Sequence, residues 1–172
     1  MSHWTKKFTL SSGALFLVLA LASPLQAASN AGYPETPDLK MTPGATCEHP
    51  DSFRYPEHVP YCSRAVKSDT KWAIIRDYDQ VLGFRIESMD RKEFKIDHLI
   101  PLCMGGSNET TNLWPQYKAI YELTDPLEPA LCGRMAEGKM SQVEAMDFIR
   151  RAKQSPQDAP KMLKELLGSD RR

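Results

Sequence analysis

The chain has 172 residues, and its 22 lysines and arginines are balanced by 22 aspartates and glutamates, which gives a formal net charge of zero at pH 7. This balance excludes the molecule-wide basic field with which many proteins attract nucleic acids. Only a local basic groove would be left for binding a polyanion.

Residues 1–27 have the features of a secretory signal peptide. Lys6 and Lys7 precede an apolar run over residues 13–22, and cleavage is expected after Ala27, with Ala28 as the alternative. The run is about half of the roughly 20 residues that a membrane-spanning helix needs. Removing 27 of the 172 residues leaves 145, the size of one domain, with 20 basic and 22 acidic residues. We therefore expect a single exported domain, periplasmic or secreted, without a membrane anchor.

Between the signal peptide and residue 85 the sequence predicts an extended arm and one helix. Residues 28–60 contain six prolines and no apolar periodicity, as in an extended arm. The remaining residues, 61–168, would form the folded domain. A helix is expected over residues 69–78, with Ser68 as its N-cap and a core-facing side made of Trp72, Ile75 and Tyr78.

All four cysteines lie in the part of the chain that would be exported, where the environment is oxidising and an even count predicts two disulfides. Three pairings can be drawn. We favour Cys47 with Cys62, which flank a Pro-rich loop, and Cys103 with Cys132, which would join the middle of the chain to a later helix. A zinc site is the competing interpretation, but the chain has no C-x-x-C pair.

A hairpin is expected in the middle of the chain. Residues 85–87 and 93–97 have the pattern of short strands. The Gly-Gly-Ser-Asn sequence at 105–108 is typical of a turn, because glycine and asparagine adopt positive φ at little cost. Leu113 and Trp114 would then return the chain as a second short strand.

Helical sequence fills most of the remaining chain. Pro126 and Pro129 interrupt it, since proline suits the first turn of a helix and not its middle, and Asp125 is the expected cap of the new start. Ser141 and Glu144 have the spacing of a capping box ahead of an amphipathic helix. A short amphipathic piece follows near the C-terminus.

The stretch FKIDHLIPLCMGGSNETTNLWPQ, residues 94–116, places an acid next to a base, Asp97 and His98, at the end of the expected strand. A phosphodiester hydrolase needs a general base to take a proton from water and a divalent cation to neutralise charge on the phosphate. Neighbouring side chains on a strand point to opposite sides, so the two residues are expected to do separate jobs. The alternative is a tight turn packed on a core.

The spacing around this pair resembles the ββα-metal hairpin of the HNH endonucleases, and it is closest to small exported HNH-like proteins. Asn112 follows His98 by 14 residues, beyond the Gly-Gly turn. The resemblance covers about residues 41–153 and includes Thr-Pro-Gly at 42–44 and Tyr-Cys-x-Arg at 61–64. The matching residues of the hairpin are Asp97, His98, Pro101, Gly105, Gly106, Asn108, Asn112, Leu113, Trp114 and Pro115.

The resemblance implies an α+β fold whose core is a hairpin followed by a helix. It implies that His98 is the general base that activates water and that Asp97 is an acidic metal ligand. Asn112 would orient the hairpin or the base. The cofactor would be a single divalent ion, Mg²⁺ in the first place and Mn²⁺ or Zn²⁺ otherwise, and carboxylate oxygens suit Mg²⁺ as ligands.

The chain departs from the family in the helix after the second strand. Many HNH sites take a further His or Asn from that helix, at positions filled here by residues 121–125, but neither residue type occurs after Asn112. Glu122 and Asp125 are the expected replacements as metal ligands, with Glu128 as a further candidate. The bland alternative is that these acids lie on a solvated face of a helix.

Lys95 and Lys118 are the expected contacts to the substrate. They would belong to a local phosphate track that also includes Arg64, Lys67, Lys71, Arg91 and Lys92, although scattered basic residues are typical of any solvated surface.

Two functional hypotheses follow. The first is a monomeric exported HNH-type endonuclease that cleaves DNA or RNA. The second is a ββα-metal fold without catalysis that binds a nucleic acid or another protein outside the cytoplasm. The sequence identifies no inhibitor protein.

Overall fold

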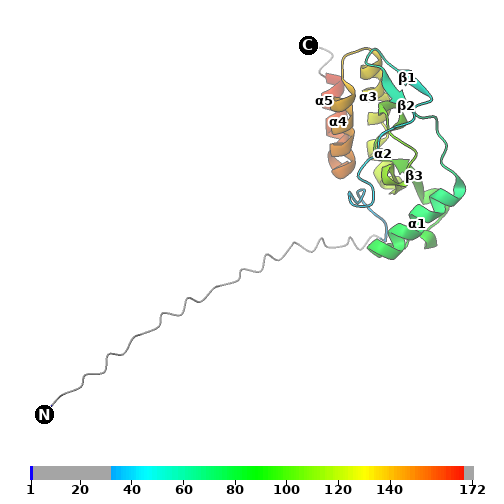
Figure 1. Ribbon diagram of the computed structural model, residues 1–172, viewed down its shortest axis with the longest axis vertical. Helices are drawn as coiled ribbons and strands as arrows, with labels where there is room; N and C mark the ends of the chain where they lie inside the picture. Colours follow the sequence, from blue (N-terminus) through cyan, green and yellow to red (C-terminus); the bar gives the residue numbers. More distant parts are fainter. Residues whose placement is uncertain (2–31, 169–172) are drawn as a thin grey trace.

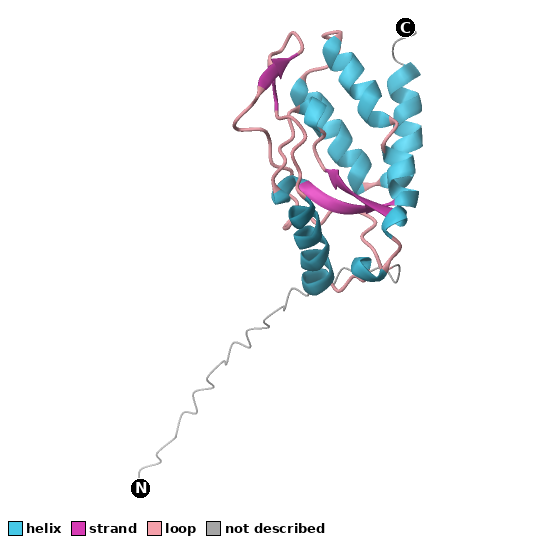
Figure 2. Cartoon of the chain, turned by 90° about the vertical axis from the view of Figure 1, so that its right-hand side faces the viewer, coloured by secondary structure: helices cyan, strands magenta, loops and turns pink. Residues whose placement is uncertain are grey.

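The computed structural model describes Met1 and residues 32–168, so the predicted signal peptide beyond Met1 and residues 28–31 of the predicted arm lie outside the described residues. The fold class is α+β, as predicted, with two small antiparallel sheets and five α-helices within residues 32–168. The elements in chain order are β1 (Ser52–Arg54), β2 (Val59–Tyr61), α1 (Ser68–Leu82), β3 (Phe94–His98), β4 (Leu113–Tyr117), α2 (Lys118–Thr124), α3 (Leu127–Ala136), α4 (Gln142–Gln154) and α5 (Ala159–Gly168). The hairpin of β3 and β4 lies between α1 and the group formed by α2 to α5 (Figure 1, Figure 2).

The Pro-rich segment is packed on the domain and does not form a separate extended arm. Thr42 is fully buried, and its hydroxyl donates a hydrogen bond of 3.0 Å to the carbonyl of Leu113. Thr46 forms a bridge with Gly106 in the hairpin loop. The strands β1 and β2 pair with each other, so β2 crosses the expected boundary after residue 60. These two strands have three residues each, which is too short for an alternating pattern to show in the sequence.

Helix α1 is longer than expected, and two of its three predicted core residues, Ile75 and Tyr78, are buried. Ser68 is its first helical residue and not its N-cap, because the N-cap is Lys67. The helix ends at Gly83, whose φ of 77° lies in the left-handed region that glycine favours. Trp72 is 46% exposed, so its predicted place in the core is wrong. The buried residues of the helix are Ile74, Ile75 and Tyr78.

The predicted strand over 85–87 is absent, and a 3-10 turn, Ile86–Ser88, takes its place. The reason is the Asp79 carboxylate, which accepts hydrogen bonds from the backbone N–H groups of Ile86 at 2.8 Å and Glu87 at 2.9 Å. Both amides are satisfied within a turn and do not need a strand partner. The second predicted strand is confirmed as β3.

Strands β3 and β4 form the antiparallel hairpin that the sequence predicts. Phe94 pairs with Tyr117 at its open end and His98 pairs with Leu113 next to the loop. Helix α2 begins at Lys118, directly after β4. The order of strand, strand and helix therefore holds over residues 94–124.

The structure has two hydrophobic cores, one between α1 and the hairpin and one among the later helices. The break at Pro126 is confirmed, but Asp125 ends α2 and does not cap α3, whose N-cap is Pro126. The capping box of α4 is confirmed: Glu144 accepts from the Ser141 backbone N–H at 2.8 Å, and the Ser141 hydroxyl accepts from the Glu144 backbone N–H at 3.3 Å. Buried residues of the core among the later helices include Leu99, Leu127, Leu131, Ala145 and Ile149.

Both predicted disulfides are confirmed. Cys47 is bonded to Cys62 and Cys103 to Cys132, and no free cysteine occurs in the described part of the chain. The second bond ties the loop after β3 to α3. Disulfides of this kind fit an oxidising compartment. Among residues 32–168, none of the helices has the length and apolar character of a membrane span.

Candidate functional site

A single buried amide closes the loop between β3 and β4. The Oδ1 atom of Asn112 accepts from the backbone N–H of Ile100 at 2.8 Å, and its Nδ2 atom donates to the carbonyls of Ile100 and Ser107, both at 2.9 Å. A Cβ atom on Gly106 would overlap the carbonyl oxygen of Ile100, so glycine is required there for packing. Asn112 thus links the two ends of this loop, and its expected role in orienting the hairpin or the base stays a prediction.

His98 ends β3 and is only 2% exposed. Its Nε2 atom lies 3.2 Å from Oδ1 of Asn108, whose Nδ2 atom donates to the carbonyl of Ser63 at 2.7 Å. Because the Asn108 amide presents its oxygen to the ring, the hydrogen of a neutral imidazole is assigned to Nε2 and the lone pair to Nδ1.

The surroundings of His98 keep its ring neutral. Burial lowers the pKa of His98 to about 4, and the nearby charge of Arg64 adds to this effect, while the hydrogen bond to Asn108 and the charge of Asp97 act in the opposite direction. The imidazole is therefore unprotonated at neutral pH and has a lone pair with which to accept a proton.

Asp97 contacts a different set of residues from those around His98. The ammonium of Lys153 on α4 donates to Oδ2 of Asp97 at 2.7 Å, to Oε1 of Glu128 at 2.8 Å and to the carbonyl of His98 at 2.6 Å. The Lys153 side chain is 0% exposed. Burial by itself would lower the pKa of Lys153, but the charges of Asp97 and Glu128 outweigh it and raise that pKa. All three hydrogens of this ammonium thus have an oxygen partner.

The second oxygen of Asp97 meets a second lysine. The Nζ atom of Lys95 lies 3.3 Å from Oδ1 of Asp97 and 2.7 Å from Oδ1 of Asp125. Burial of Asp97 would raise its pKa, but the positive charges of Lys153 and Lys95 outweigh this effect and hold the pKa of Asp97 below its usual value. Asp97 is therefore a carboxylate at neutral pH with a cation on each side.

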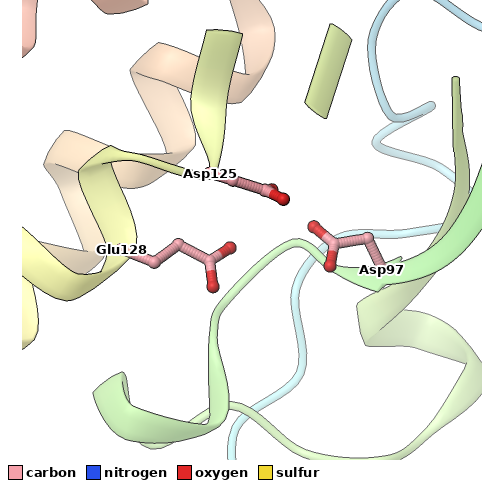
Figure 3. Close-up of side chains that lie close together, drawn as sticks. All are labelled: Asp97, Asp125 and Glu128. Carbon is pink, nitrogen blue, oxygen red and sulfur yellow. The ribbon is translucent and has the colours of Figure 1, made fainter. Parts of the chain in front are cut away.

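Three carboxylates converge at this point, from β3, from the end of α2 and from α3 (Figure 3). One oxygen from each of Asp97, Asp125 and Glu128 lies within 4.8 Å of the others. In number and type these oxygens would suit a hard divalent ion. As the side chains lie, however, such an ion does not fit, because the buried ammonium of Lys153 stands between Asp97 and Glu128. The predicted magnesium ion stays a prediction.

The predicted site residues divide into two groups. Asp97, Asp125 and Lys95 are brought together, whereas Glu122 and Lys118 lie on the exposed surface of α2 and are not part of the acidic group. Lys95, expected to contact substrate, is engaged by the two aspartates.

Sequence reasoning missed Lys153. A signal for it existed, because Lys153 follows Ile149 by four residues and so falls on the buried stripe of α4, where an unpaired lysine would be costly.

Comparison with known proteins gave no match: no protein-family model, no curated protein and no solved structure matches this chain. The structure by itself defines a disulfide-linked α+β protein with a partly buried group of acids and lysines between its central hairpin and the helices that follow.

Proposed function

We propose that this protein is an exported phosphodiester hydrolase of the HNH type, acting on DNA or RNA, in which His98 accepts the proton of the attacking nucleophile. The observation that carries the proposal is the neutral imidazole at the end of β3, next to a loop that Asn112 holds closed. A general base must be unprotonated at the working pH, and a pKa of about 4 meets this condition.

The substrate would approach from the side of Asn108 and Ser63. Asn108 is partly exposed and Ser63 is exposed, so displacement of the Asn108 amide uncovers the Nε2 side of the His98 ring. It also removes the acceptor that holds the hydrogen on Nε2, so that the tautomer with its lone pair on Nε2 would face the nucleophile. Arg64 is exposed and its charge lowers the pKa of His98, so its guanidinium would be available to an arriving phosphate. Arginine pairs with two phosphate oxygens at once, and the contact needs no globally basic protein.

The test is a nuclease assay on plasmid DNA and on a long single-stranded RNA, with EDTA, Mg²⁺ or Mn²⁺ added. We expect wild type to cleave at least one substrate and His98→Ala to lose activity by about 100-fold or more, the usual contribution of a general base. His49→Ala is the matched control, because His49 is exposed in the Pro-rich segment. Equal rates for wild type and His98→Ala would rule out the proposed role.

A second candidate function is favoured by the lysines in the acidic group. Since Lys153 and Lys95 pair with Asp97, the charge of this carboxylate is balanced without a metal ion, and the fold could serve as a binding module. This candidate predicts that labelled DNA or RNA binds equally to wild type and to His98→Ala, as measured by fluorescence anisotropy, and that neither protein cleaves it. Cleavage that depends on His98 would exclude it.

A further inference from the structure

We propose that the ammonium of Lys153 is the permanent cation of the hairpin and that it takes the place at which a divalent metal ion would otherwise join Asp97 to the following helices. The native protein would then hold no divalent ion at Asp97. This inference concerns the acidic group and stands whether or not His98 is a base.

The surroundings of Lys153 are those of a hard cation. Its Nζ atom is held by two carboxylate oxygens, from Asp97 and Glu128, and by one backbone carbonyl, from His98, at 2.6 to 2.8 Å. Carboxylates and carbonyls are also the ligands with which proteins bind Mg²⁺ and Ca²⁺. The ammonium has the same effect as an ion in this position, because it neutralises Asp97 and fixes the end of β3 against α3 and α4.

The two lysines of the group differ in how easily they can leave. The Lys95 side chain is 34% exposed and can turn into solvent, so it would not prevent an ion from binding. The Lys153 side chain is 0% exposed and extends from the buried side of α4, which also contributes Ala145, Ile149 and Ala152 to the core. Lys153 cannot withdraw unless α4 leaves the core.

The positive charge of Lys153 also opposes a metal ion at Asp97. The group has three acids, Asp97, Asp125 and Glu128. Two of their negative charges are balanced by the positive charges of Lys95 and Lys153. A divalent ion at Asp97 would lie close to the Lys153 ammonium in a region from which water is largely excluded, where like charges repel strongly. If Lys153 is removed, the same three acids become a site of three oxygens that lacks its cation.

Lys153 is also a positioning residue for His98. It donates to the carbonyl of His98 and so fixes the backbone from which the imidazole extends. Lys153 acts on the position of His98 and not on its ring, because the Nζ atom contacts the backbone carbonyl of His98.

The test compares divalent-ion binding by wild type, Lys153→Met and Lys161→Met. Methionine matches the length of the lysine side chain without its charge, and Lys161 is an exposed control on α5, with a side chain that is 79% exposed. Mn²⁺, Mg²⁺ and Ca²⁺ are titrated by calorimetry and by thermal shift. We expect no saturable binding to wild type or Lys161→Met. We expect binding of one ion to Lys153→Met, with a Tm that rises with metal concentration, and loss of that binding in Lys153→Met combined with Asp97→Asn.

Two results would overturn the inference. One is saturable binding of one ion to wild type that Asp97→Asn abolishes, and the other is a folded Lys153→Met protein that binds none of the three ions. If Lys153→Met does not fold, the inference is tested on wild type. Its lysines are acylated, and the modified positions are mapped by mass spectrometry. Lys153 should resist acylation while Lys161 reacts, and equal reaction of the two in the folded protein contradicts the burial on which the inference rests.

Discussion

Asn112 and Ile100 are joined by two hydrogen bonds across the hairpin loop, one in each direction, between the side-chain amide of the first and the backbone amide and carbonyl of the second. Both residues are fully buried. The side chain therefore imitates the backbone of a strand partner at the point where the pairing of β3 with β4 ends. The side-chain amide of Asn112 thus satisfies three backbone groups of the loop.

Replacing Asn112 should destabilise the protein more than any exposed substitution. Asn112→Ala leaves the N–H of Ile100 and the carbonyls of Ile100 and Ser107 without the amide. Each buried group left unsatisfied costs about 1 to 3 kcal/mol, so for three such groups we expect the free energy of unfolding to fall by about 3 kcal/mol or more. Urea unfolding followed by circular dichroism measures it. Asn108→Ala, at a partly exposed position, should cost less, and an equal loss would contradict this account.

Two glycines give a matched pair of alanine variants. Gly106→Ala should destabilise the loop strongly, because the new methyl group would overlap backbone atoms of Ile100, which cannot move away as a flexible side chain could. Gly133 lies in α3 with no atom within 4 Å of an added Cβ. Gly133→Ala should raise stability by about 0.5 to 1 kcal/mol, the usual gain in helix propensity. Thermal denaturation of both variants checks the opposite signs, and a stable Gly106→Ala protein would refute the close packing.

The Cys103 to Cys132 disulfide should stabilise the protein more than the Cys47 to Cys62 disulfide. It closes the longer loop, with a sequence separation of 29 against 15. Chain entropy then predicts losses of about 3.5 and about 3 kcal/mol when each pair is changed to serine. The Cys103 to Cys132 disulfide also packs against the helical core, which adds to its stabilising effect. Urea unfolding of the two double variants gives the order, and the reverse order would show that chain entropy does not dominate.

Tyr78 should make stability depend on alkaline pH. Burial raises its pKa to about 12 from 10.0, although hydrogen bonds to Thr42 and Asp38 act in the opposite direction. A raised pKa in the folded state means that the stabilisation is complete below pH 10 and is lost as the pH rises through 12. Two pKa units correspond to about 2.7 kcal/mol.

Tyr78→Phe removes this dependence and also removes the 2.9 Å contact with Thr42, at a cost of about 1 kcal/mol near pH 8. Between pH 10 and 12, wild type should therefore lose more stability than Tyr78→Phe. Unfolding curves recorded at several pH values measure the difference. A constant difference over this range would mean that Tyr78 does not titrate differently in the folded state.

The parts of the fold that follow local rules were predictable from the sequence. The capping box at Ser141, the turn at Gly105 and the hairpin strand before His98 each depend on residues close together in the chain. Both disulfide pairs were also predictable, since few pairings exist for four cysteines.

The errors have tertiary causes. Trp72 belongs to a helix with apolar residues on more than one side, and only contact with the hairpin decides which side is buried. The Asp97 ion pair joins residues 56 positions apart, so no local pattern could reveal Lys153 as its partner. The candidate site was therefore predicted as far as its hairpin, and its cation was not.

The distance along the chain between Asp97 and Lys153 also sets an order of events. A chain that emerges from its N-terminal end presents β3 first, then α3 with Glu128, and α4 only afterwards. Until Lys153 has emerged, Asp97 and Glu128 would bring like charges together without a cation between them. The hairpin and α3 therefore gain little by docking early, since contacts between distant residues form late. We therefore expect the acidic group to be completed only when Lys153 has emerged.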